Sequence, residues 1–358
     1  MKRGRVFRFV FVVTGLLVGL CSAEFVLSWY YATRPILFPE GVMTRDGSSY
    51  GYRPTSGLRG PLMQSPAGDL RAAIYTDDWG LRVSSTASVA TTDRGDRILV
   101  LGDSQTFGAW VEGEAAYPTV LDRLFEDEAN PVRVLNAGVP GYGTADALAY
   151  YSDRLHRLQA RLVVLGLFLG NDVADNVRAA VSRPMELNIP LKSRLRRLHF
   201  YRLLAESYDS LLVRLGFRSA GFYSGTALLE DPPQPWVDEG WQRTRTLLSE
   251  LADAVRSHDA RLVVVVLPFG NQVVPHLRQS WEGDSLNGPQ RRVAAMCREI
   301  GLQCIDVLVA LQAEADRGVS VFFPERDIYS FAVNFIHLTP AGHDAVARAM
   351  AKALEANR

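Results

Sequence analysis

Short apolar segments that alternate with amphipathic ones constrain the fold of this chain most strongly. The clearest are residues 97–101 (RILVL), 162–169 (LVVLGLFL) and 262–267 (LVVVVL). Continuous apolar runs of this length, rich in β-branched residues, predict strands that are buried on both faces. Shorter runs at 132–135 and 303–305 predict two further strands of the same sheet.

The segments between these strands carry apolar residues at helical spacing. We expect helices at residues 117–125, 144–158, 241–258, 289–300 and 339–355. The last helix has Thr339 as a candidate N-cap and Pro340 at its first helical position. Buried strands that alternate with helices predict a three-layer α/β/α sandwich around a central, mainly parallel sheet. Such sheets bind ligands at the carboxyl ends of their strands.

The N-terminus has the pattern of a signal anchor. A basic flank at residues 1–8 precedes a largely apolar stretch at 9–32, which is long enough to cross a bilayer if Glu24 is tolerated. Positive residues stay in the cytoplasm, so the pattern predicts a single-pass inner-membrane protein whose body faces the periplasm or the cell exterior. Cleavage at Ala23, after a run of small residues, followed by secretion, is the alternative.

Two segments fall outside the alternation of strands and helices. Residues 33–94 are rich in Gly, Pro, Ser and Thr without sustained periodicity, and we interpret them as a linker and N-terminal extension. Residues 178–237 include a basic amphipathic stretch at 192–215, and we expect an insertion that packs over or beside the site. The remaining domain is predicted to span residues 95–358.

The charge balance and the cysteine count argue against several classes of protein. Lys+Arg and Asp+Glu both total 39, which gives no electrostatic case for nucleic-acid binding. The three cysteines and six histidines show no zinc-binding spacing, and nothing in the sequence calls for a metal or a cofactor. In an oxidising compartment Cys297 and Cys304 could form a disulfide, but two separate buried thiols fit the sequence equally.

Polar residues follow the predicted strands at the points where each strand ends. Ser104, in GDSQTFG at 102–108, lies between a buried strand and a helix, where it can serve as a nucleophile or as a simple helix cap. The glycines of NAGVPGYG at 136–143 can expose backbone N–H donors, and Asn171 in GND can offer a side-chain amide. His337 lies just before the closing helix.

Taken in order, these four blocks resemble the SGNH hydrolase superfamily, also called the GDSL esterase/lipase family. The resemblance runs from roughly residue 78 to the end, and WGLR at 79–82 is similar to the lead-in of membrane-anchored bacterial members. It implies a flavodoxin-like fold and a serine esterase in which Ser104 attacks an ester and His337 moves its proton. It also implies an oxyanion hole made by the N–H groups of Ser104 and Gly141 and the side chain of Asn171, with Gly138 as the alternative glycine.

One position departs from the family pattern. The aspartate expected three residues before His337 is Asn334. Asn334 could orient the imidazole through its carbonyl oxygen, or Asp327 or Glu325 could supply the missing acid. A third interpretation is an impaired site that binds rather than cleaves.

The predicted function is hydrolysis of acyl esters, with O-acetyl groups on cell-envelope or exported glycans as the expected substrates. Transfer of an acyl group to a polysaccharide by the same residues is an alternative, and so is glycan binding by a catalytically impaired protein. The expected partners are therefore an acyl ester or acylated glycan, and a membrane through the N-terminal helix.

Overall fold

The computed structural model describes residues 7–8, 11–12, 14–15, 18–26, 38–39, 41–45, 48–65, 70–85, 96–126, 132–181, 225–281, 285–326 and 333–356. The chain divides into two units. One comprises residues 1–35 and 183–222, and the other comprises residues 36–182 and 223–358. The second unit contains all four sequence blocks that carry the candidate site, and it is described by itself below.

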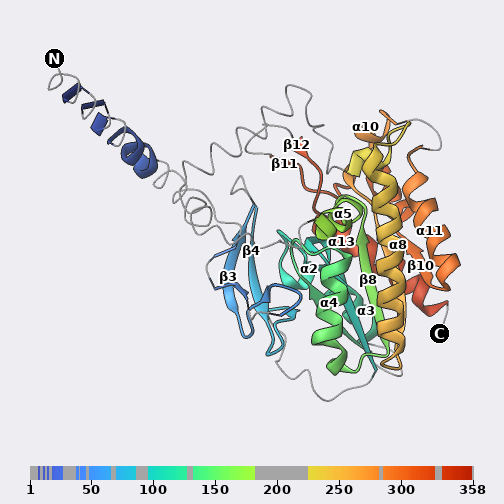
Figure 1. The fold of residues 1–358 in the computed structure, drawn as a ribbon. Coiled ribbons are helices and arrows are strands. Elements are labelled where there is room, and N and C mark those ends of the chain that lie inside the picture. The colour runs from blue at the N-terminus through green and yellow to red at the C-terminus, as the bar shows by residue number, and fades with distance from the viewer. Residues whose placement is uncertain are drawn as a thin grey trace. The chain divides into compact units, whose positions relative to one another are not determined.

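An eight-stranded sheet with the order β10-β9-β8-β6-β7-β5-β4-β3 forms the centre of this unit (Figure 1). Its parallel strands are β6 (Arg97–Gly102), β7 (Arg133–Gly138), β8 (Leu162–Phe168), β9 (Arg261–Leu267) and β10 (Gln303–Asp306). Numbered along the chain, these strands have the order 2-1-3-4-5, which is that of the flavodoxin-like fold. The predicted mainly parallel sheet is therefore confirmed.

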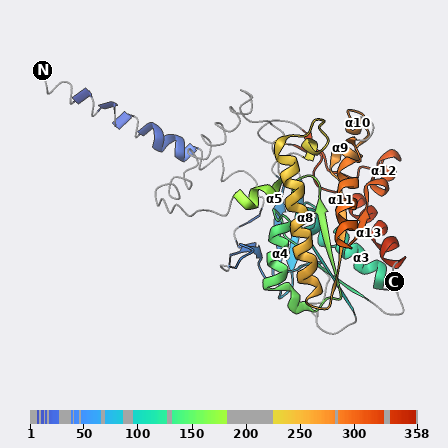
Figure 2. The same ribbon diagram turned by 45° about the vertical axis from the view of Figure 1, so that its right-hand side comes forward.

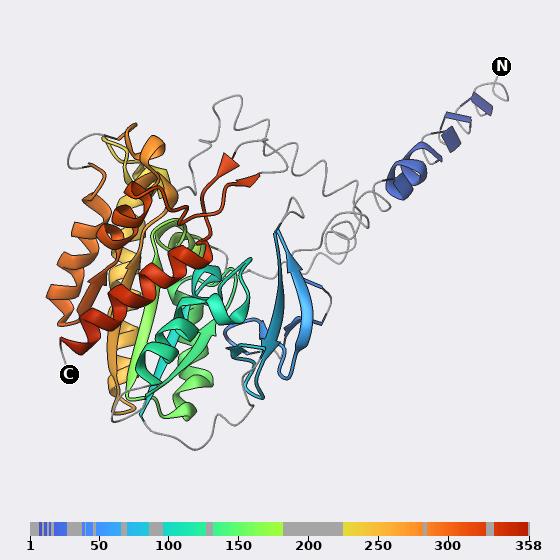
Figure 3. The ribbon, with the colours of Figure 1, turned by 180° about the vertical axis from the view of Figure 1, so that it is seen from behind.

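Helices cover both faces of the sheet. On one face α4 (Thr144–Asp153) lies beside α8 (Pro235–Arg256), which runs along the length of the sheet (Figures 1 and 2). On the other face α3 (Tyr117–Glu126) packs against α13 (Pro340–Glu355), as the view from behind shows (Figure 3). Burial on both sides explains why β9 carries an unbroken run of buried aliphatic residues.

Further helices complete the connections between strands. They are α2 (Ser104–Phe107), α5 (Asp172–Val181), α9 (Gly270–Val273), α10 (Pro275–Arg278), α11 (Gly288–Ile300) and α12 (Leu308–Asp316). The closing helix α13 begins as the sequence predicts, because the Thr339 hydroxyl accepts a hydrogen bond from the Gly342 N–H at 3.2 Å and Pro340 follows it.

The N-terminal extension contains strands that the sequence patterns did not predict. It forms β1 (Met43–Thr44), β2 (Arg53–Pro54), β3 (Arg59–Gln64), β4 (Arg71–Thr76) and β5 (Arg82–Val83). The last three join the edge of the sheet in antiparallel order beside β7. Their shortness and the glycine and proline residues among them hide the alternating pattern, which is complete only in β4.

The extension also contributes to a second hydrophobic cluster. Met63 and Ile74 from β3 and β4 are fully buried there with Phe107 and Trp110, which follow β6. Because Ser104 and Phe107 are the first and last residues of α2, this packing fixes the chain immediately after the candidate nucleophile.

Two other predicted segments fall mainly on residues that the structure does not describe. Within the predicted membrane segment 9–32, residues 18–26 are helical, and most of the rest lies outside the described residues. No helix among the described residues has the length and apolar character of a membrane span. The predicted insertion 178–237 overlaps the end of α5 and the start of α8, and its basic stretch at 192–215 lies outside the described residues.

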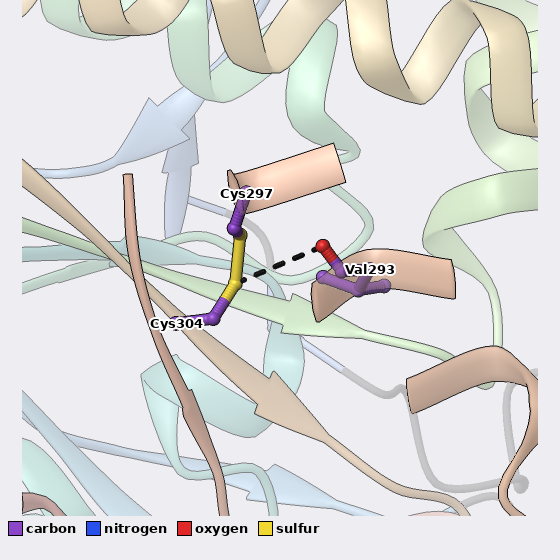
Figure 4. The surroundings of a disulfide bond; sticks show 3 residues. All are labelled: Val293, Cys297 and Cys304. Carbon is purple, nitrogen blue, oxygen red and sulfur yellow. Dashed lines mark hydrogen bonds between the residues drawn. A yellow bond between two sulfur atoms is a disulfide. The ribbon is translucent and has the colours of Figure 1, made fainter. Parts of the chain in front are cut away.

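Cys297 and Cys304 form a disulfide bond between α11 and β10, with 6.2 Å between their Cα atoms (Figure 4). The bond bridges the turn that leads from the helix into the last strand of the sheet. It decides between the two states of these cysteines that the sequence left open.

Candidate active site

The four sequence blocks meet at the carboxyl edge of the parallel sheet. Ser104 follows β6, Gly141 follows β7 and Asn171 follows β8. The strands are in matched register, with Gly102 opposite Gly138 and Leu101 opposite Leu165. The order of the sheet reverses between β6 and β8, and such switch points are where open α/β sheets bind their ligands.

Ser104 is the first residue of α2, and its side chain meets the imidazole of His337. The Oγ atom of Ser104 lies 3.0 Å from Nε2 of His337. Asp103 caps the helix by accepting the Gln105 N–H on Oδ1 at 2.9 Å, so Ser104 is not needed as the cap. A serine hydroxyl at hydrogen-bond distance from an imidazole is the arrangement that activates a nucleophile.

Glu325 occupies the third place in this arrangement. Its Oε1 atom lies 2.8 Å from Nδ1 of His337 and accepts the His337 backbone N–H at 2.9 Å. The two side chains are only 9% and 13% exposed, so water screens their attraction weakly. A carboxylate at Nδ1 fixes the imidazole tautomer and stabilises the imidazolium that forms when Nε2 takes a proton.

Glu325 lies on a short hairpin that leads to His337. The hairpin consists of β11 (Glu325–Arg326) and β12 (Val333–Asn334), and Glu325 is the antiparallel Cα partner of Asn334. Among the described side chains, Glu325 is the candidate partner whose carboxylate reaches the imidazole. Asp327 and the side chain of Asn334 lie outside the described part of the hairpin.

Trp110 holds the other oxygen of this carboxylate. Its indole Nε1–H donates to Oε2 of Glu325 at 3.1 Å, and the same nitrogen lies 2.9 Å from Nδ1 of His337. The indole ring stands edge-on to the imidazole, with 5.5 Å between the ring centroids. Glu325 thus receives hydrogen bonds from two separate directions, which fixes its carboxylate plane. Trp110 has a φ of 66°, a strained conformation for a large side chain, as is common at functional sites.

A buried arginine from the extension supports the Trp110 loop. The Arg82 guanidinium donates to the carbonyl oxygens of Gly108 at 3.1 Å and Val111 at 2.7 Å, on either side of Trp110. It also lies over the Phe107 ring, 4.5 Å from the centroid. Burial lowers the pKa of Arg82 to about 10, and the nearby carboxylates of Glu112 and Glu114 partly offset this lowering.

Gln105 fixes the loop that carries His337. Its Nε2–H donates to the carbonyl oxygen of Ile336, and its Oε1 accepts the Leu338 N–H at 3.2 Å. One buried side chain therefore binds the backbone on both sides of His337. Since Gln105 is the next residue after Ser104, it connects the backbone at Ser104 to the backbone on both sides of His337.

Three donors are available to stabilise negative charge beside Ser104. Neither the Ser104 N–H nor the Gly141 N–H donates to any acceptor within the described residues. The Asn171 side chain also has no partner in the described part of the chain, and its Oδ1 is buried. The Gly138 N–H, in contrast, donates to Oδ1 of Asn136 at 3.0 Å, so it is already occupied.

Two buried carboxyl groups are chain neighbours of Ser104 and Asn171. Asp103 and Asp172 each accept a backbone N–H, from Gln105 and from Phe168 respectively. Burial raises the pKa of Asp103 to about 6, and burial together with the negative charge of Asp103 raises the pKa of Asp172 well above its usual value. These contacts brace the two loops, and neither carboxylate is hydrogen-bonded to His337.

His343 is the second histidine of the C-terminal block, and it is held neutral in the core. Its Nδ1 accepts the Tyr117 N–H at 3.2 Å, and its ring stacks on Tyr117. Complete burial lowers its pKa to about 3. It anchors α13 to the start of α3 and does not touch Ser104.

Sequence patterns do not indicate the roles of Trp110 and Gln105. They indicate no role for Arg82 either, although it belongs to the WGLR block at 79–82. Their partners lie far away along the chain, and no local spacing reports such contacts. No group of His, Cys, Asp and Glu residues that could hold a metal ion occurs among the described residues.

The sequence that forms this site matches a known protein family. The sequence model of the GDSL-like lipase/acylhydrolase family matches residues 100–345, more than half of the chain. A search of curated protein sequences finds no match.

Three solved structures are examples of those similar to this chain. An acetyl xylan esterase, AlAXEase, is 14% identical with a TM-score of 0.41, and the match covers 72% of this chain and 99% of that chain. TesA is 15% identical with a TM-score of 0.41, over 73% of this chain and 99% of its own. A catalytic mutant of Axe2, an acetylxylan esterase from Geobacillus stearothermophilus, is 18% identical with a TM-score of 0.39, over 73% and 94% of the two chains.

Proposed function

This chain belongs to the GDSL-like lipase/acylhydrolase family of ester-hydrolysing enzymes, and we propose that it is a serine esterase that forms an acyl-enzyme on Ser104. The observation that carries the proposal is the continuous set of contacts from Ser104 through His337 to Glu325. These contacts also argue against an impaired site, because a carboxylate lies at Nδ1 of His337 although residue 334 is asparagine.

In the first half of the reaction, Ser104 Oγ attacks the ester carbonyl while His337 Nε2 takes its proton. Glu325 stabilises the positive charge that develops on the imidazole, without itself becoming protonated. The tetrahedral intermediate collapses when the imidazolium protonates the departing alcohol. In the second half a water molecule, deprotonated by the same Nε2, attacks the acyl-enzyme and releases the carboxylic acid.

The negative oxygen of each tetrahedral intermediate needs donors that are already in place. We assign this role to the N–H groups of Ser104 and Gly141 and to the side-chain amide of Asn171. Their lack of partners within the described residues supports the assignment. Loss of one such donor typically lowers the rate by about 10²–10³.

We further propose that the enzyme acts outside the cytoplasm, held by its N-terminal segment in the inner membrane. Its substrates there are O-acetyl or related small acyl esters on cell-envelope or exported glycans. The basic flank before an apolar segment supports this location, as does the Cys297–Cys304 disulfide, because disulfides persist in oxidising compartments. A C-terminal reporter that is active only in the cytoplasm tests the location. Cytoplasmic reporter activity would contradict the proposal.

The reaction is tested with the full-length protein in detergent and an O-acetylated glycan. We expect acetate to be released at a rate proportional to enzyme, and we expect Ser104→Ala to abolish the release. Mass spectrometry of the glycan fraction separates hydrolysis from transfer, because an acyltransferase would move the acetyl group to a second sugar. Transfer without acetate release would replace the hydrolase assignment, and activity that survives Ser104→Ala would refute the assigned nucleophile.

A further inference from the structure

We propose that Tyr52 is a positioning residue of the oxyanion hole, which fixes the direction of the Gly141 N–H. This inference rests on the proposed role of Gly141 in the esterase reaction. Tyr52 lies in the N-terminal extension, upstream of the part of the chain that matches the family, residues 100–345. The proposal therefore makes the extension part of the catalytic machinery of this protein.

The contact that carries the proposal involves a single peptide unit. The Tyr52 hydroxyl donates to the carbonyl oxygen of Pro140 at 2.7 Å. The carbonyl of Pro140 and the N–H of Gly141 belong to the same planar peptide group, and in a trans peptide they point in opposite directions. A hydrogen bond that holds the carbonyl oxygen on one side thus directs the N–H to the other.

The peptide needs this support because glycine leaves its orientation weakly defined. Gly141 has a φ of 82°, in a region that glycine enters without steric penalty and other residues rarely adopt. Its own N–H has no protein acceptor among the described residues that could fix the peptide from the other side. The space where a Cβ would lie is already taken by the Tyr52 hydroxyl, which would be only 2.8 Å away.

Tyr52 is itself held in place by the loop that it supports. The Tyr142 hydroxyl donates to the backbone carbonyl oxygens of Tyr50, at 3.1 Å, and of Tyr52. The rings of Tyr52 and Tyr142 meet edge to face, with 5.4 Å between their centroids. The extension and the loop after β7 thus bind each other in both directions.

The ionisation state of Tyr52 suits a permanent donor. Burial, assisted by the negative charge of Asp146, raises the pKa of Tyr52 to about 12. The hydroxyl therefore keeps its proton through the pH range in which an esterase of this type works.

The test compares Tyr52→Phe with a matched control, Tyr150→Phe, in the full-length protein. Tyr150 lies in the same aromatic cluster, with its ring 4.7 Å from that of Tyr50, but its buried hydroxyl has no partner among the described residues. Both variants lose one tyrosine hydroxyl, and only the first loses a contact with the Gly141 peptide. The measurements are kcat and KM for 4-nitrophenyl acetate, the inhibition constant of phenylboronic acid, and Tm.

For Tyr52→Phe we expect kcat to fall by about 10- to 100-fold with KM nearly unchanged, because a misdirected donor loses part of its stabilisation of the transition state. The inhibition constant of the boronate, whose serine adduct is tetrahedral, should rise by a similar factor. Tyr150→Phe should keep the wild-type values.

Three results would overturn the inference in different ways. If wild type hydrolyses the ester through Ser104 and Tyr52→Phe matches Tyr150→Phe in kcat and in boronate affinity, the role of Tyr52 is refuted while the esterase assignment stands. If wild type shows no Ser104-dependent hydrolysis, the esterase assignment fails and the role of Tyr52 fails with it. A fall in Tm without a change in kcat would leave Tyr52 a purely structural residue.

Discussion

Glu325 and Asn334 face each other as antiparallel partners across the β11–β12 hairpin, and the carboxylate that reaches His337 comes from Glu325. Asn334 stands where the family usually has its aspartate, three residues before the histidine. The acid therefore comes from the facing position of the neighbouring strand. The longer side chain of glutamate suits this change, because the carboxylate must reach the same imidazole nitrogen from a different Cα.

Replacement of Glu325 by Gln should nearly abolish hydrolysis. Glutamine keeps the size of the side chain, but it removes the charge that stabilises the imidazolium and can favour the wrong tautomer. The equivalent change in a serine protease costs about 10⁴ in rate, and we expect a fall in kcat of about 10³–10⁴. Glu112→Gln is the matched control: this exposed carboxylate accepts the Ala73 N–H of β4, and its attraction to the Arg82 guanidinium is shared with Glu114. Equal activity of both variants would refute the role of Glu325.

The same hairpin offers a rescue experiment. Addition of Asn334→Asp to Glu325→Gln returns a carboxylate to the hairpin at the facing position. Cross-strand partners project from the same face of a hairpin, so we expect at least about a tenfold recovery of kcat over the single variant. A double variant no better than Glu325→Gln would show that the hairpin places only position 325 within reach of the imidazole.

Trp110→Phe should weaken catalysis without removing the ring that packs on His337. The change deletes the indole N–H that binds Oε2 of Glu325. Because hydrogen bonds to charged groups contribute about 1.5–3 kcal/mol, we expect kcat to fall by at least about tenfold as the carboxylate loses its fixed plane. The control is Trp236→Phe in α8, whose indole N–H binds Gln234. A wild-type kcat for Trp110→Phe would contradict this account.

Gln105→Met should show whether Gln105 positions the His337 loop for catalysis or only stabilises the fold. Both Gln105 and Gln290 are buried glutamines with side-chain hydrogen bonds, but Gln290 bonds to the side chain of Gln272 and not to the backbone beside His337, so Gln290→Met is the control. Each substitution should lower the free energy of unfolding by roughly 1–3 kcal/mol, because buried polar partners are left unpaired. Only Gln105→Met should also lower kcat, by about tenfold or more, since it releases both sides of the His337 loop. If natively folded samples of the two variants have equal kcat values, the positioning role of Gln105 is contradicted.

His343 gives a prediction about stability and pH. Its pKa is about 3 in the folded protein, against an ordinary value of 6.5. A histidine with a lowered folded pKa contributes stability above pH 6.5 that is lost as the pH falls toward 3. Between pH 8 and pH 5 the loss from this group amounts to about 2 kcal/mol.

The comparison of wild type with His343→Gln isolates this effect. Asp103 acts in the opposite sense, because its pKa is raised to about 6 and its unfavourable ionisation is relieved as the pH falls below that value. This contribution is shared by both proteins and cancels in the difference. We expect urea unfolding to show a smaller loss of stability on acidification for His343→Gln, and parallel pH profiles would contradict the buried neutral state of His343.

Sequence patterns predicted the parts of this protein that follow local periodicity. The buried strands β6, β8 and β9 and the cap of α13 were readable because each depends on residues adjacent in the chain. The strand ends then brought Ser104 and His337 to one edge of the sheet, where the structure joins them.

The remainder depends on contacts between distant residues. Nothing in the sequence ranked Glu325 above Asp327, because the choice is made by the register of a hairpin with only two residues in each strand. The strands β3 to β5 are too short and too interrupted for their alternation to be seen. Arg82 anchors the Trp110 loop through Val111, which lies 29 residues further along the chain. Local sequence spacing cannot predict a contact over that separation.

The most direct test of the central claim is covalent labelling of Ser104 by a fluorophosphonate, followed by peptide mass spectrometry. The full-length wild type, Glu325→Gln and Glu112→Gln are exposed to the probe, and the rate of adduct formation on the peptide that contains Ser104 is measured. The account predicts rapid labelling of wild type and Glu112→Gln at Ser104, and a rate for Glu325→Gln that is lower by orders of magnitude. Labelling of Ser104 at the same rate in all three proteins, or no labelling of the folded wild type, would contradict a nucleophile activated through His337 and Glu325.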